Sequence, residues 1–132
     1  MTSVHEKLLP LFFVRTKRER YVEMISNPKK RPKFLGELDH FYSLDPRYVI
    51  PTEPKKLFPE QIAEILTKKG APQSCWITSA DPELDGKDMP LVEALRKVVG
   101  CQMGTFLSCI PGRLAYFEGE DLGVRWILER RS

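Results

Sequence analysis

The chain has 132 residues, of which 42% are hydrophobic and 30% are charged, and its formal net charge is +3. This length fits one domain whose core is large enough to fold without a disulfide or a metal, and the apolar fraction excludes a disordered chain. No apolar run approaches the roughly 18 residues that a membrane-spanning helix needs. We therefore expect one cytoplasmic domain over residues 1–132 that has no contact with a membrane.

Charge is distributed unevenly along the chain. Residues 1–58 hold 12 Lys and Arg against 7 Asp and Glu, which gives a net charge of +5, and residues 59–132 have a net charge of −2. Prolines gather between these two parts. The pattern predicts a basic helical arm over 1–42, a Pro-rich connector over 43–58 and an α+β core over 59–132.

The first apolar segment is residues 8–14, LLPLFFV. A secretory signal would have basic residues before this run and small residues after it, whereas here several basic residues follow it and Pro10 interrupts it. We interpret the segment as docking either on the fold or on a partner subunit. In the second case Phe12 and Phe13 would form the contact of a homodimer.

Two short helices are predicted after this segment. Thr16 and Glu19 have the spacing of a capping box at the start of a helix over 17–26. Asn27 and Pro28 end that helix, and a second helical stripe follows. The apolar residues of this stripe are Phe34, Leu35, Leu38 and Phe41.

The connector is predicted to be stiff and extended, with a short strand at 48–50. Beyond it we expect a helix over 59–69, a strand over 74–80 and a helix that Asp88 caps and Gly100 ends. Three further strands follow, at 105–110, 113–118 and 123–129. This order predicts an α+β fold with a four-stranded, mostly antiparallel sheet and helices on one face, preceded by a basic two-helix N-terminal arm.

The arm carries the main candidate binding surface, because eight cations lie within residues 15–33. A positive patch raises the local concentration of anions such as phosphate backbones. The alternative is an ordinary solvated face, and no RNA- or DNA-binding signature accompanies the charges. The predicted partner-binding residues are Arg15, Lys17, Arg18, Arg20, Lys29, Lys30, Arg31 and Lys33.

An acidic loop offers a rival site for a ligand or a metal. Its carboxylates are those of Asp81, Glu83, Asp85 and Asp88. Counted from Asp81, the loop begins like an EF-hand, but position 12, where a bidentate Glu belongs, is Val92. Carboxylates at these positions are also typical of turns and helix caps.

Other reactive side chains are few. The three cysteines form no CxxC pair and are interpreted as buried, reduced thiols. His40 follows Asp39 and is interpreted as a half-buried helix-end histidine. Trp126 alternates with Val124 and Leu128 and is predicted to face the core. The sequence assigns no catalytic residue, metal ligand or cofactor.

The leading functional hypothesis is a non-enzymatic interaction module. Its basic arm would contact an acidic partner, which is either a nucleic acid or the acidic half of another subunit in a homo-oligomer. The alternative is a small enzyme or ligand-binding domain that uses the acidic loop 81–88.

Overall fold

The computed structural model describes residues 3–51, 58–121 and 124–130. Within these residues, six strands form one antiparallel sheet in the order β1-β6-β5-β4-β2-β3. The strands are β1 (Val49–Pro51), β2 (Ser74–Ser79), β3 (Asp88–Pro90), β4 (Thr105–Ile110), β5 (Leu114–Glu118) and β6 (Arg125–Glu129). The α-helices are α1 (Val4–Leu8), α2 (Arg18–Ser26), α3 (Arg31–Glu37), α4 (Pro59–Lys68) and α5 (Leu91–Val98). Single 3₁₀ turns are η1 (Leu9–Phe12), η2 (Arg15–Lys17), η3 (Leu38–His40) and η4 (Pro46–Tyr48).

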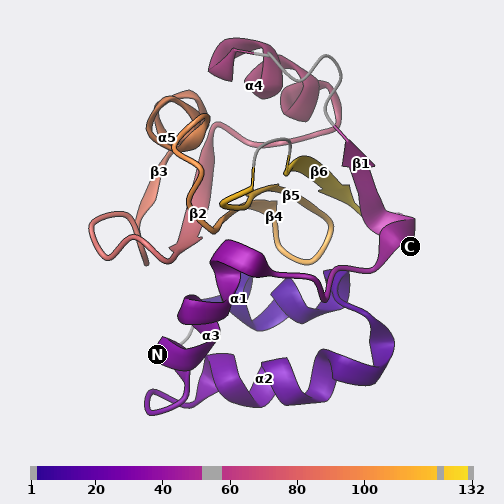
Figure 1. The fold of residues 1–132 in the computed structure, drawn as a ribbon. Coiled ribbons are helices and arrows are strands. Elements are labelled where there is room, and N and C mark those ends of the chain that lie inside the picture. The colour runs from indigo at the N-terminus through magenta and orange to yellow at the C-terminus, as the bar shows by residue number, and fades with distance from the viewer. Residues whose placement is uncertain (1–2, 52–57, 122–123, 131–132) are drawn as a thin grey trace.

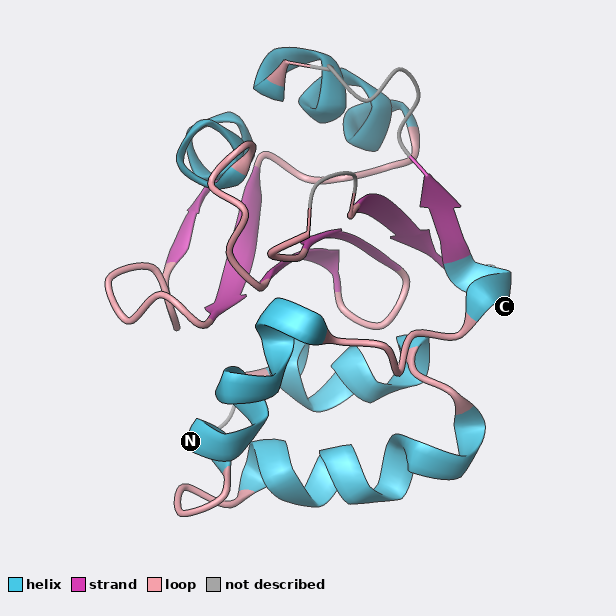
Figure 2. Ribbon diagram, viewed as in Figure 1, coloured by secondary structure: helices cyan, strands magenta, loops and turns pink. Residues whose placement is uncertain are grey.

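The sheet lies between two layers of helices (Figures 1 and 2). Successive residues of a strand point to opposite faces, so neighbouring residues serve different cores. Phe106, Phe117 and Leu128 pack against the N-terminal helices. Leu107 and Tyr116 pack against α4 and α5. The prediction of helices on one face therefore holds for α4 and α5, and the N-terminal arm covers the other face.

Aromatic rings hold the N-terminal layer to the sheet. The Phe13 ring contacts those of Tyr21, Phe41 and Phe106, with centroid separations of 5.2, 4.8 and 5.9 Å. Phe12 and Phe13 are both 0% exposed. The segment 8–14 thus docks on its own fold, and these two side chains have no surface left to offer a second copy. The structure does not support their assignment as dimer contacts.

The sheet is larger than predicted, because the prediction of four strands missed β3 and did not count β1 as part of the sheet. Asp88 does not cap a helix; it pairs with Trp76 in β3. The helix begins three residues later because Pro90 holds an extended backbone at the N-cap position, and the Leu91 N–H donates to the Gln73 carbonyl. The predicted capping box at Thr16 is also absent, since η2 occupies that turn.

Both edges of the sheet are short. The edge strands β1 and β3 have three residues each and end at a proline. Proline at an edge removes a donor that another chain could pair with, so these edges are poor templates for aggregation. The predicted connector lies partly in 52–57, outside the described residues. None of the described helices combines the length and apolar composition of a bilayer-spanning segment.

Candidate functional site

Two of the eight predicted partner-binding cations are part of the internal structure. Arg18 donates from Nε to the Phe13 carbonyl and from Nη2 to the Leu11 carbonyl, both at 3.1 Å. These bonds satisfy carbonyl groups at the end of the apolar segment. Arg31 lies between α1, α3 and the β2–β3 loop, where it bonds to two carboxylates. Neither guanidinium is therefore free for a partner.

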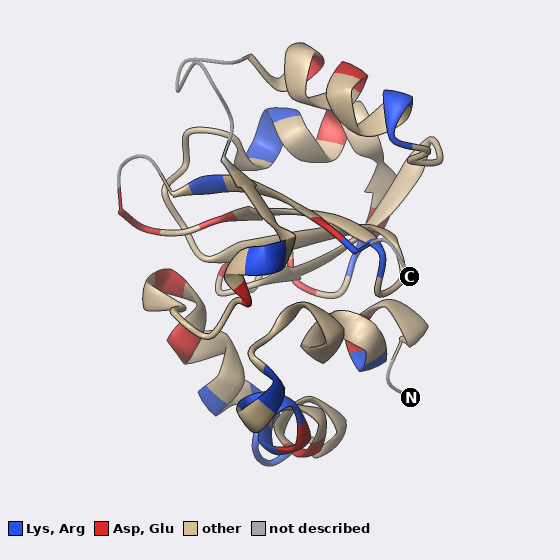
Figure 3. Cartoon of the chain, turned by 90° about the vertical axis from the view of Figure 1, so that its right-hand side faces the viewer, with Lys and Arg blue, Asp and Glu red and all other residues tan. Residues whose placement is uncertain are grey.

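The other six cations are exposed on the outer side of the N-terminal layer, and we call this surface the α2–α3 face. It comprises Arg15, Lys17, Arg20, Lys29, Lys30 and Lys33. Figure 3 shows the blue segments of this layer at the bottom of the view, on the side away from the sheet.

The cations of the two ion pairs on the α2–α3 face are exposed. Arg20 lies 3.6 Å from Glu37, and Lys30 pairs with Glu23. The Lys30 pair holds the pKa of Glu23 below its usual value. Such pairs contribute little to stability, so they leave the cations free to exchange partners. Within the described residues, the side chains of Arg15, Lys29 and Lys33 form no hydrogen bond or ion pair.

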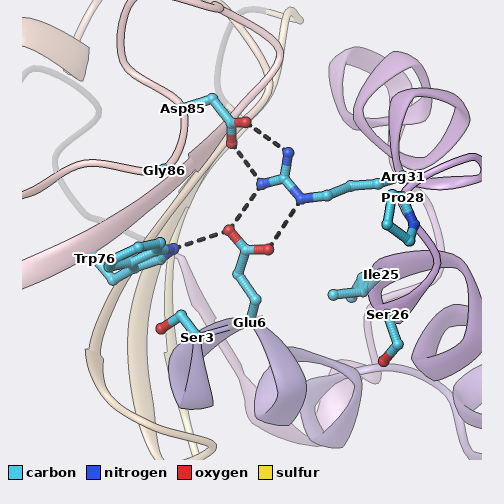
Figure 4. Close-up of a pocket in the computed structure, with 9 residues that line it drawn as sticks. All are labelled: Ser3, Glu6, Ile25, Ser26, Pro28, Arg31, Trp76, Asp85 and Gly86. Carbon is cyan, nitrogen blue, oxygen red and sulfur yellow. Dashed lines mark hydrogen bonds and ion pairs between the residues drawn. The ribbon is translucent and has the colours of Figure 1, made fainter. Parts of the chain in front are cut away.

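A buried network ties the N-terminal layer to the sheet (Figure 4). Arg31 donates to Glu6 from Nε at 3.0 Å and from Nη2 at 2.8 Å. It also donates to Asp85 from Nη1 at 2.7 Å and from Nη2 at 2.9 Å. The hydrogen bonds with Asp85, and then with Glu6, raise the pKa of Arg31 against the opposing effect of its burial.

The Glu6 carboxylate is saturated with donors. Besides Arg31, its Oε2 accepts from Trp76 Nε1 at 2.9 Å and from Thr78 Oγ1 at 3.2 Å. Asp85 in turn accepts from the Ser79 N–H at 3.0 Å. Because the bonding capacity of these groups is used within the chain, the Glu6–Arg31–Asp85 network is a structural tie between distant segments.

Two pockets adjoin this network. One, of about 290 Å³, is lined by Glu6, Arg31, Trp76 and Asp85 together with parts of α1 and α2. The other, of about 480 Å³, lies between α3 and the β2–β3 loop and shares Asp85 with the first. Asp85, from the predicted acidic loop, thus lines two pockets, although its carboxylate is already paired with Arg31.

The remaining acidic-loop residues serve as turn and strand residues. Asp81 accepts from the Glu83 N–H at 3.0 Å, as a turn-forming aspartate does. Asp88 is exposed on β3. Among residues 3–51, 58–121 and 124–130, no three His, Cys, Asp or Glu side chains come together as a metal site.

A serine–histidine pair lies beside the network. His5 Nδ1 is 2.7 Å from Ser108 Oγ, and the His5 ring stacks over Trp76 at a centroid distance of 6.4 Å. Ser108 is only 1% exposed, so its hydroxyl is out of reach of a substrate. Burial lowers the pKa of His5, and the charge of Asp88 partly opposes this. The pair fastens α1 to β4.

Sequence reasoning missed an apolar groove between the segment 41–46 and the strands β1 and β6. It has a volume of about 390 Å³ and is lined by Phe41, Tyr42, Leu44, Pro46, Val49 and Trp126. The prediction that Trp126 faces inward is confirmed, since it packs against the N-terminal core, but it is only partly buried. The run of aromatic and proline residues at 41–51 is the sequence feature from which this groove could have been predicted.

Comparison with known proteins identifies no relative: no protein-family model matches the chain, and no curated protein or solved structure does so either.

Proposed function

We propose that this protein is an interaction module whose α2–α3 face binds the phosphate backbone of a nucleic acid. The observation that carries the proposal is the division of the eight cations. Arg18 and Arg31 bond to internal acceptors, whereas the other six are exposed on one layer. A fold that needed the charges only for stability would have no use for six exposed cations together.

The balance of charge on this face favours an anionic partner. Its six cations are accompanied on the same elements by three carboxylates, those of Glu19, Glu23 and Glu37. A pocket of about 200 Å³ between α2 and α3 is lined by Arg20, Lys30 and Lys33 with Glu23 and Met24. Three cations around one hollow attract an anion, and a net positive field accelerates its arrival.

The side chains favour contact with the backbone over contact with bases. The aromatic residues of α2 and α3, Tyr21 and Phe34, are buried in the core, at 2% and 0% exposure. Stacking on single-stranded bases requires exposed rings. Exposed lysines suit phosphate contacts, which give affinity without sequence preference.

The test is fluorescence anisotropy of a labelled DNA duplex and a labelled RNA, titrated at two salt concentrations. Binding must weaken steeply with salt, with a log–log slope of about 0.7–0.9 for each phosphate neutralised. The double variant Lys29→Glu/Lys33→Glu should abolish binding while thermal unfolding stays cooperative.

The matched control reverses two exposed lysines of the opposite layer, in the variant Lys68→Glu/Lys97→Glu. This variant changes the net charge by the same amount and should keep most of the affinity. Absence of binding at low salt, or equal loss in the two variants, would overturn the proposal.

A second candidate function is the binding of a small ligand at the acidic loop. The pockets of about 290 and 480 Å³ on either side of Asp85 favour it. Calorimetric titration with calcium, magnesium and nucleotides tests it. Heat of binding that Asp85→Asn removes while thermal unfolding stays cooperative would support this candidate, and no heat would reject it.

A further inference from the structure

The apolar groove is a hydrophobic hollow for which the fold itself gives no use. It lies beside the edge strand β1, between the segment 41–46 and β6, and has a volume of about 390 Å³. Tyr42 forms one wall and is 76% exposed. Large aromatic side chains that remain exposed beside a hollow often mark a binding surface.

The walls of the groove are held by the core. The Phe41 ring lies 4.8 Å from that of Phe13 and 5.8 Å from that of Phe106, and the Trp126 ring lies 6.0 Å from that of Phe117. These rings cannot shift without disturbing the aromatic cluster. A groove that exists before binding needs little ordering when a partner arrives, which favours affinity.

One end of the groove is acidic. The Tyr42 hydroxyl donates to Asp121 Oδ2 at 3.4 Å, which places this carboxylate at the rim. Glu120 lies beside it, 2.9 Å from His40 Nε2, and the same histidine is 3.8 Å from Asp121. All three rim side chains are more than half exposed, so their charges face solvent.

In the described part of the chain, the other end carries no acidic rim, and Arg130 lies over the Tyr48 ring there, 5.5 Å from its centroid. Near Pro46, the exposed Arg47 donates to Asp45 at 2.7 Å, so its charge is already neutralised. The groove therefore presents an apolar floor that leads to a negative rim at its Tyr42 end.

Trp126 adds a donor. Its indole N–H forms no hydrogen bond within the described residues. Trp126 lines the groove, and an indole N–H can donate to a carbonyl group of a peptide that has no internal hydrogen bonds.

We propose that this groove binds an extended, proline-containing peptide segment that carries a Lys or Arg toward its Tyr42 end. Proline rings pack on aromatic faces, and a polyproline II segment loses little conformational entropy on binding and leaves its carbonyls free. A basic residue then reaches Glu120 and Asp121. An amphipathic helix fits less well, because its anchors extend over two turns or more and the hollow is at the small end of ligand pockets.

The proposal is tested by nuclear magnetic resonance titration of the ¹⁵N-labelled protein with three short peptides. The first contains two spaced prolines and an arginine, the second has the arginine replaced by glutamate, and the third has the prolines replaced by alanine. We expect the first to shift the signals of Tyr42 and the Trp126 indole, and the other two to bind at least about tenfold more weakly.

Two variants locate the site. Tyr42→Ala removes the exposed wall and Asp121→Lys reverses the rim, and each should weaken the first peptide by about tenfold or more. Their controls are Phe58→Ala, which removes another exposed ring, at 67% exposure, and Glu93→Lys, which reverses an exposed charge on α5. Both controls should bind as the unmodified chain does.

Several outcomes overturn the proposal. Absence of binding, or shifts that map away from the groove, rejects the site. Equal binding of the alanine peptide rejects recognition of proline, and equal binding of the glutamate peptide rejects the role of the acidic rim. Lys29 and Lys33 do not line the groove, so Lys29→Glu/Lys33→Glu should leave peptide binding unchanged, and this result separates the two proposals.

Discussion

Arg31 and Asp85 are 54 positions apart in the chain, yet they face each other through two parallel hydrogen bonds of 2.7 and 2.9 Å. This bidentate pair joins α3 to the β2–β3 loop, and the opposite side of the same guanidinium joins α1 through Glu6. One arginine thus fastens two N-terminal helices to the sheet, in addition to the aromatic core beneath them.

Removal of this tie should destabilise the fold strongly. Arg31→Met leaves the Glu6 carboxylate, in a residue that is only 4% exposed, without its charged partner. Breaking a buried pair by loss of one partner typically costs about 3–5 kcal/mol. Urea unfolding followed by tryptophan fluorescence should show this loss.

The neighbouring Lys30 supplies the control. Its pair with Glu23 is exposed, so Lys30→Met should change the unfolding free energy by no more than about 0.5 kcal/mol. The double variant Glu6→Gln/Arg31→Met, which removes both charges, should recover part of the loss. A loss below about 1 kcal/mol in Arg31→Met would show that the network is not a tie.

The role of Arg31 could not be predicted from the sequence. It stands between Lys30 and Pro32 in a basic run, and nothing local separates it from the cations that remain exposed. Its partners, Glu6 and Asp85, come from the first helix and from a loop in the other half of the chain. Only the packing of the N-terminal layer on the sheet brings the three together.

The difference between local sequence patterns and contacts of distant segments also explains which parts of the fold were predictable. The helix α4 and the strands β4 and β6 have their own periodicity and turn residues, so their predicted ranges agree with the structure to within about two residues. The edge strand β3 has three residues and no periodicity, and its pairing with β2 decides its conformation. The aromatic groove was missed for a similar reason, since segment 41–46 and Trp126 meet only in three dimensions.

Gly104 should be intolerant of any side chain. A Cβ atom there would lie 2.2 Å from the backbone carbon of Leu38 and 2.5 Å from the Asp39 nitrogen. Backbone cannot move aside as a side chain does, so Gly104→Ala should force β4 away from η3 and strain the 2.7 Å bond from its N–H to Asp39 Oδ1. We expect a loss of about 1–3 kcal/mol or more in chemical unfolding.

Gly36 provides the contrasting substitution. It lies in α3 with nothing within 4 Å of an added Cβ. Gly36→Ala should therefore stabilise the chain by about 0.5–1 kcal/mol, through the better helix propensity of alanine. If the two alanine variants had similar stability, the close approach at Gly104 would be refuted.

The three cysteines should differ sharply in reactivity. Cys101 is exposed, whereas Cys75 and Cys109 are 2% exposed on strands of the sheet. Burial raises the pKa of Cys75 to about 12 and raises that of Cys109 as well, so neither is a thiolate near neutral pH. Iodoacetamide should add one group to the native chain and three in denaturant, as mass spectrometry will show. A native Cys101→Ser variant should take up none, and any rapid second addition would contradict the burial of the strand thiols.

Acidification should weaken the attachment of α1 through His5. Burial lowers the pKa of His5 in the folded chain, and Asp88 only partly opposes this, while the unfolded chain keeps a value near 6.5. The unfolded chain therefore binds the proton more readily, so the contribution of His5 to stability is complete above about pH 6.5 and falls as the pH drops toward the pKa of the folded chain.

The variant His5→Gln tests this prediction, because it keeps a side chain that can bond to Ser108 but cannot titrate. Urea unfolding at about pH 7.5 and about pH 5.5 should show a larger acid loss in the unmodified chain than in His5→Gln. Equal losses would mean that His5 is not held in its neutral form, and that the sensitivity to acid comes from the carboxylates alone.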